Sequence, residues 1–121
     1  MLMRDEGCKM IIYPGAFNMT TGPAHWQLLQ RARAVDHQLY VAAVSPARSK
    51  NKNDYQAWGH SSVVSPWGDI VAEVSDEAQG QHVIVADLDF DNVNEFRSSV
   101  PTSLQKRLDI YSIGPTATQE P

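Results

Sequence analysis

The sequence YPGAFNMTTGPAHW, residues 13–26, joins the apolar residues 10–12 to a segment with helical periodicity. It predicts the loop that leaves a strand and enters a helix, which is where open α/β sheets bind their ligands. We expect the amides of the first helical turn to point outward there, and the helix dipole to favour a carboxylate or a phosphate. Gly22 would let the backbone approach a neighbour closely. The same residues also fit an ordinary capped connection, with Thr21 or Gly22 as the N-cap and Phe17 as packing.

The segments on either side of this loop complete a repeating pattern. Residues 8–13 are a short apolar run typical of a buried strand, and residues 39–44 are a second one. Between them, residues 23–36 have helical periodicity. The residues of this helix expected to face the core are Trp26, Leu28, Leu29, Ala32 and Val35. Strand, helix and strand at this spacing predict a βαβ unit, with parallel strands joined by a right-handed crossover.

The second half of the chain predicts further α/β structure. Residues 60–65 and 70–74 flank a Pro-Trp-Gly-Asp turn and indicate a β-hairpin. Residues 83–88 predict another strand, and residues 91–98 predict a helix. Residues 114–121 have almost nothing to bury, so we expect a disordered tail. The fold class is therefore α/β, with a mixed sheet and flanking helices.

One face of the predicted sheet lacks a cover. Two helices cover at most one face, yet residues 8–13 and 39–44 have the composition of strands buried on both faces. Residues 1–6 resemble the last turn of a helix, with Gly7 at its end. We therefore expect the chain to be part of a larger domain, truncated at its N-terminus.

Composition and charge exclude several functions. The formal net charge is −4 and the pI is about 5.4, so no basic surface for nucleic acid is expected. No apolar run is long enough to cross a bilayer, so no membrane partner is expected. The single cysteine, Cys8, cannot form an internal disulfide, which favours a reducing compartment, either the cytoplasm or the mitochondrial matrix.

No complete set of catalytic residues is visible. Cys8 begins an apolar strand without an identifiable base, which indicates a structural thiol. The four histidines lack metal-ligand spacing, and residues 87–91 alternate Asp with apolar residues, which fits an N-cap better than a calcium loop. No metal, no cofactor and no catalytic residue is therefore assigned to this chain.

An ordered series of motifs nevertheless resembles a known family. Residues 13–26, 31–36, 40–41, 45–48, 58–61 and 66–68 are similar, in this order, to the C-terminal part of the carbon–nitrogen hydrolase, or nitrilase, superfamily. The similarity is strongest to its omega-amidase branch.

This resemblance implies a fold and a reaction. The superfamily fold is a four-layer αββα sandwich, of which residues 1–113 would form the C-terminal half. Its chemistry uses a Glu, Lys and Cys triad, and all three positions fall upstream of Met1, so Cys8 is not the nucleophile. The omega-amidase reaction cleaves the terminal amide of 2-oxoglutaramate or 2-oxosuccinamate to the 2-oxo acid and ammonia.

The same resemblance implies that part of the substrate pocket is present. Phe17, Asn18, Thr20 and Thr21 would line it near the reacting carbon. A threonine hydroxyl and nearby backbone amides would hold the distal carboxylate of the substrate. His60 would lie at the edge of the pocket.

Two interpretations follow, and whether the chain is an enzyme stays open between them. In the first, it is a fragment of an omega-amidase-like hydrolase that is inactive without the missing portion, with a 2-oxo acid amide and further copies of itself as partners. In the second, it is a catalytically inactive product that acts as a dimerising or interaction module.

Overall fold

The computed structural model describes residues 2–74 and 80–111. Its elements in chain order are α1 (Leu2–Asp5), β1 (Met10–Pro14), α2 (Thr21–His37), β2 (Tyr40–Val44), β3 (Ser62–Val64), β4 (Ile70–Glu73) and α3 (Phe90–Ser99). The tail predicted at residues 114–121 lies outside the described residues.

The four strands form one mixed sheet in the order β1-β2-β3-β4. β1 and β2 are parallel, with Ile11 opposite Val41, and α2 connects them, so the predicted βαβ unit is confirmed. β3 pairs with β2 and with β4 in antiparallel orientation, which confirms the predicted hairpin. Because β1 and β2 are parallel neighbours, the loops that follow them leave the same edge of the sheet.

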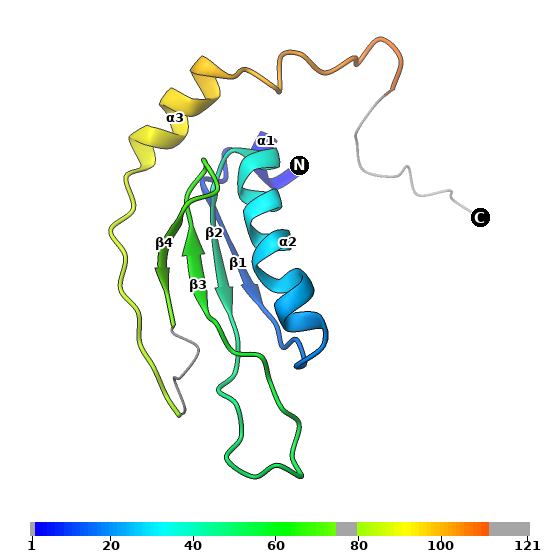
Figure 1. Ribbon diagram of the computed structural model, residues 1–121. Helices are drawn as coiled ribbons and strands as arrows, with labels where there is room; N and C mark the ends of the chain where they lie inside the picture. Colours follow the sequence, from blue (N-terminus) through cyan, green and yellow to red (C-terminus); the bar gives the residue numbers. More distant parts are fainter. Residues whose placement is uncertain (1, 75–79, 112–121) are drawn as a thin grey trace, which may run out of the picture.

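Helix α2 covers one face of this sheet (Figure 1). The core beneath it consists of Ala34, Leu39, Val41 and Val64, with Ile11 and Tyr13 packed against them. α2 buries Gly22, Trp26, Gln30 and Ala34, which recur every four residues and form one continuous ridge.

The predicted apolar face of α2 was partly wrong. Trp26 is buried as expected, but Leu28 is 63% exposed, and the polar Gln30, which is not among the residues expected to face the core, is buried. The helix carries apolar side chains on more than one side, so its periodicity alone does not say which side meets the sheet.

The opposite face of the sheet is open at β1 and at the end of β2. Ile11 and Tyr13 pack under α2, so the alternation of a strand directs Ile12 to the other face, where it is 61% exposed. Val44, at the end of β2, is also exposed. Tyr40 and Ala42, on the same face of β2, are buried, so among the described residues this face lacks cover only around Ile12 and Val44.

The strand predicted at residues 83–88 is wrong for this structure. The segment is extended but has no strand assignment, and Val83 and Val85 are 90% and 85% exposed. It lies apart from β4 in Figure 1. A strand is stabilised by hydrogen bonds to a neighbour, and this segment makes no backbone hydrogen bond to β4, the edge strand that precedes it, or to any other described strand. The helix that follows is confirmed as α3, with the side chain of Asp89 accepting from the Asp91 amide as its N-cap.

Candidate functional site

The side chain of Asn18 caps helix α2. Its Oδ1 accepts hydrogen bonds from the Thr20 amide at 2.9 Å, the Thr21 amide at 2.8 Å and the Thr21 hydroxyl at 3.0 Å. Its backbone carbonyl accepts from the Gly22 amide at 2.8 Å. The N-cap position itself is Thr20, whose side chain makes no capping bond. The expectation that Thr21 or Gly22 is the N-cap was therefore wrong, because Asn18 caps the helix from two residues further upstream.

This arrangement changes how the start of α2 can bind an anion. Asn18 already accepts from the amides of Thr20, Thr21 and Gly22, and Pro23 has no N–H, so the amides expected to point outward are occupied. What remains is the helix dipole, a first turn without acidic residues, and side-chain donors. Because three donors fix Oδ1 of Asn18 against the helix, its Nδ2 points away from the helix. No described residue accepts a hydrogen bond from Nδ2.

Phe17 lies just before this cap and packs into the protein. Its ring meets that of Trp26 edge to face, with centroids 5.2 Å apart. Trp26 is buried, and its indole N–H donates to the carbonyl of His60 at 2.7 Å. Phe17 is therefore held in a fixed orientation at the rim of the loop.

A second loop, residues 57–60, lies directly against the first. Asn18 and Ala57 form an antiparallel bridge, and the Trp58 amide donates to the Phe17 carbonyl at 2.7 Å. A Cβ placed on Gly22 would lie 2.2 Å from Cγ of Trp58. Only glycine leaves room for this contact, so the close approach expected at Gly22 is confirmed.

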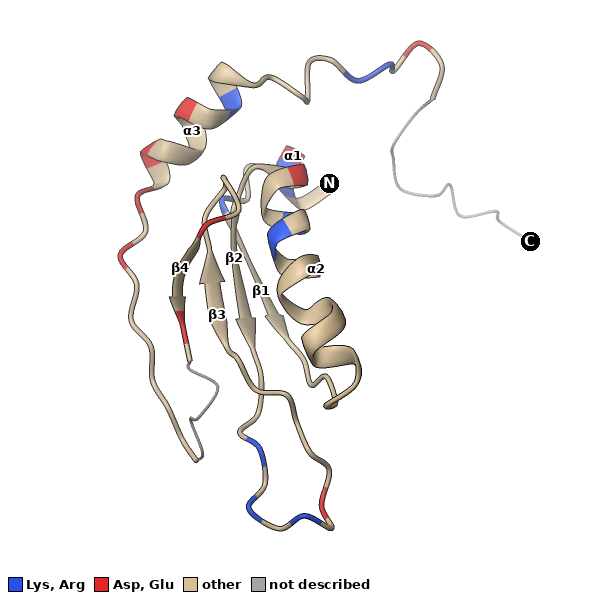
Figure 2. Ribbon diagram, viewed as in Figure 1, with Lys and Arg blue, Asp and Glu red and all other residues tan. Residues whose placement is uncertain are grey.

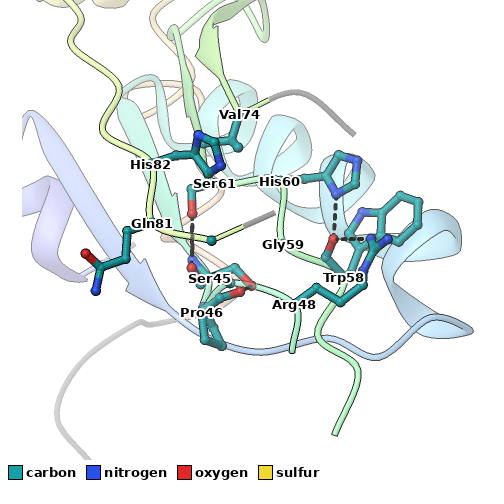
Figure 3. Close-up of a pocket in the computed structure, with 12 residues that line it drawn as sticks. Ser45, Pro46, Arg48, Trp58, Gly59, His60, Ser61, Val74, Gln81 and His82 are labelled. Carbon is teal, nitrogen blue, oxygen red and sulfur yellow. Dashed lines mark hydrogen bonds between the residues drawn. The ribbon is translucent and has the colours of Figure 1, made fainter. Parts of the chain in front are cut away.

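His60 joins this cluster through Trp58. The two rings are stacked with centroids 4.1 Å apart and planes 9° apart, and Nδ1 of His60 lies 2.8 Å from the Trp58 carbonyl oxygen. His60 has a φ of 59°, in the left-handed region. It lines a cavity of about 220 Å³ together with Ser45, Arg48, Trp58 and other residues (Figure 3).

The structure thus brings four of the five predicted site residues together at the start of α2. These are Phe17, Asn18, Thr20 and Thr21, and His60 is linked to them through Trp58 and Trp26. None of the four lines the cavity at His60.

Arg48, which the sequence marked only as part of the motif at residues 45–48, organises the second loop. Its Nε donates to the Ala57 carbonyl and its Nη2 to the Trp58 carbonyl, both at 3.0 Å. Its guanidinium lies over the Trp58 ring, 5.8 Å from the centroid. The available signal was its position in the motif at residues 45–48. Figure 2 shows Lys and Arg outnumbering Asp and Glu on this segment.

Cys8 and the metal-ligand side chains add no second site. The Cys8 thiol is half-buried and lies 2.8 Å from the Met10 carbonyl oxygen, to which it donates. Within residues 2–74 and 80–111, no group of three or more His, Cys, Asp or Glu side chains is placed to hold a metal ion. In the same ranges, no helix has the length and hydrophobicity to cross a membrane.

Comparison with known proteins identifies the family. The model of the carbon-nitrogen hydrolase family matches residues 1–98 of the chain. The chain belongs to the carbon-nitrogen hydrolase family. It is 54% identical over 112 residues to omega-amidase NIT2 of Xenopus tropicalis, which covers 93% of this chain and 39% of that protein. It is 51% identical over 109 residues to omega-amidase NIT2 of Homo sapiens, covering 90% and 38% respectively.

A solved structure from the nitrilase superfamily has the same fold. Nit3 of Saccharomyces cerevisiae, a member of branch 10 of the nitrilase superfamily, superposes with a TM-score of 0.78 and 48% identity, covering 88% of this chain and 37% of that one. The chain therefore spans about two fifths of the length of these relatives. The resemblance drawn from the motifs, and the α/β fold with a mixed sheet, are confirmed.

Proposed function

We propose that this chain is part of an omega-amidase that hydrolyses the terminal amide of 2-oxoglutaramate or 2-oxosuccinamate. The observation that carries the proposal is its 51–54% identity to omega-amidases over nine tenths of its length. In this reaction the amide and one water give the 2-oxo dicarboxylate and ammonium. The Glu, Lys and Cys that the family uses would come from the part of the enzyme that this chain does not span, and residues 1–113 would form the C-terminal part of the domain.

Within that enzyme, the start of α2 would bind the carboxylate at the far end of the substrate from the amide. The amides there are already bonded to Asn18, so the donors would be Nδ2 of Asn18 and the hydroxyls of Thr20 and Thr21. The Thr21 hydroxyl now donates to Asn18 and would turn toward the substrate. The helix dipole adds attraction for the negative charge. Phe17 and His60 would form the adjacent walls of the pocket.

The open sheet face fits the same proposal. Ile12 and Val44 would be covered by the remainder of the family domain. The complete enzyme would associate with further copies of itself. It would act in the cytoplasm or the mitochondrial matrix.

A chimera tests this function directly. Residues 1–113 replace the matching segment of the Xenopus tropicalis omega-amidase, and ammonia release from 2-oxoglutaramate is measured. We expect activity within about tenfold of the parent enzyme, and none from the 121-residue chain alone, which lacks a nucleophile. A matched chimera whose nucleophilic cysteine is replaced by alanine controls for contaminating amidase.

A folded chimera without activity would contradict the omega-amidase proposal. It would favour the alternative in which this chain is a non-catalytic interaction module.

A further inference from the structure

Arg48 uses its planar guanidinium to hold two consecutive carbonyls of the second loop. Nε and Nη2 reach the carbonyls of Ala57 and Trp58 at equal distances of 3.0 Å, and the same group lies over the Trp58 ring. No described carboxylate forms an ion pair with Arg48. Two donors in a rigid planar fork fix a backbone segment in a way that the point-like ammonium of lysine, with its freely rotating donors, cannot.

The segment held by Arg48 is the one that contacts the start of α2. The Trp58 indole lies against Gly22 in the first turn, and the Trp58 amide donates to the Phe17 carbonyl. Ala57 bridges to Asn18, whose side chain caps the helix. Three separate contacts therefore run from the loop at residues 57–58 to the predicted carboxylate-binding turn.

We propose that Arg48 is a positioning residue for substrate recognition. It holds Trp58 and Ala57 so that Asn18 and Thr21 are fixed in the orientation that receives the carboxylate of the substrate. This inference rests on the proposed omega-amidase function for its substrate, but the positioning of the turn rests on the contacts alone.

The competing role for Arg48 is attraction by charge. It lines the cavity at His60, and a cation there would draw an anion whatever its hydrogen-bond geometry (Figure 3). Two substitutions separate these roles. Arg48→Lys keeps the charge and loses the fork, whereas Arg48→Met keeps the stem and loses both. If Arg48 acts by positioning, both variants should lose order in the first turn of α2, and affinity for the substrate, to the same extent. If it acts by charge, only the methionine variant should show these losses.

The first measurement is solvent exchange of backbone amides in the full chain, followed by NMR. In both Arg48 variants we expect the amides of Thr20, Thr21 and Gly22 to exchange about tenfold faster. This is the increase expected when that turn loses the stability that about one hydrogen bond contributes. The Ala34 amide, inside α2, should keep its rate. The matched control is Arg33→Lys, because Arg33 is an exposed arginine of α2 that pairs with Asp36 at 3.7 Å.

Unchanged exchange at the three amides in both variants would overturn the inference, and so would a change confined to Arg48→Met. If the Arg48 variants lose protection throughout α2, the same measurement on Trp58→Ala decides. That variant leaves the carbonyls held by Arg48 but removes the ring that meets Gly22. Loss of amide protection confined to the first turn of α2 supports the positioning role. Loss of protection throughout α2 shows a purely structural role.

The second measurement is kinetic and uses the chimera described above. For Arg48→Lys we expect KM for 2-oxoglutaramate to rise about tenfold with kcat within about twofold, because binding of a remote group is lost. The kinetics of 4-oxopentanamide, which has the same chain without the carboxylate, should not change. Equal losses on both substrates would overturn the role in recognition. A parent chimera that is inactive would refute the proposed function, while amide exchange would still decide the positioning of the turn.

Discussion

Replacing Gly22 by alanine should destabilise this protein, although glycine to alanine normally stabilises a helix. Gly22 lies in the first turn of α2, and its φ is not in the left-handed region, so alanine fits the backbone. The added Cβ, however, would lie 2.2 Å from Cγ, 2.4 Å from Cβ and 2.7 Å from Cδ2 of Trp58. These atoms are at the root of the indole, so a rotation of the side chain cannot remove the clash and the backbone of the loop has to move.

The magnitude follows from two opposing effects. Helix propensity would contribute up to about 1 kcal/mol in favour of alanine. Overpacking typically costs about 1–3 kcal/mol, and contacts this short belong at the upper end of that range. We therefore expect Gly22→Ala to lower the free energy of unfolding by about 1–2 kcal/mol.

The assay is chemical denaturation followed by tryptophan fluorescence, repeated in a Trp58→Ala background. Without the indole the clash is absent, so Gly22→Ala should then stabilise by about 0.5–1 kcal/mol. A Gly22→Ala variant at least as stable as the parent chain, with Trp58 present, would refute the close packing of the two loops.

Other predictions concern the cap, the substrate, pH and the open sheet face. Asn18→Ala should lower stability by about 1–2 kcal/mol in denaturant titrations, whereas Asn18→Asp, which still accepts from the amides, should stay near the parent. In the active chimera, Thr21→Val should reduce kcat/KM for 2-oxoglutaramate roughly tenfold to a hundredfold and leave kcat/KM for 4-oxopentanamide unchanged. Equal losses of kcat/KM on both substrates would show that Thr21 has only a structural role. Burial lowers the pKa of His37 below 6.5, so the folded chain binds that proton more weakly than the unfolded chain. The free energy of unfolding therefore decreases as the pH falls below 6.5. His37→Gln should therefore flatten the fall in Tm between about pH 7 and 5. The chain should self-associate in analytical ultracentrifugation, and Ile12→Lys should weaken this association; a monomeric parent chain would contradict it.

Much of the architecture follows from local sequence. The apolar runs at residues 8–13 and 39–44, with a helical segment between them, determine a parallel βαβ unit, because period and turn residues depend only on near neighbours in the chain. The Pro-Trp-Gly-Asp turn determines the hairpin of β3 and β4 in the same way. The ordered motifs determine the family, and the loop at residues 13–26 marks where the site begins.

Tertiary structure decided what depends on partners distant in sequence. Residues 83–88 have the composition of a strand, but they make no backbone hydrogen bond to a described strand. The side of α2 that is buried depends on the sheet beneath it, which is why Leu28 is exposed and Gln30 is not. The amides at the start of α2 are occupied because Asn18 turns back onto them, and Arg48 matters because it holds a loop ten residues away against that turn. The periodicity of a segment indicates whether that segment favours helix or strand. A hydrogen bond between two loops, however, forms only once the sheet has brought the loops together.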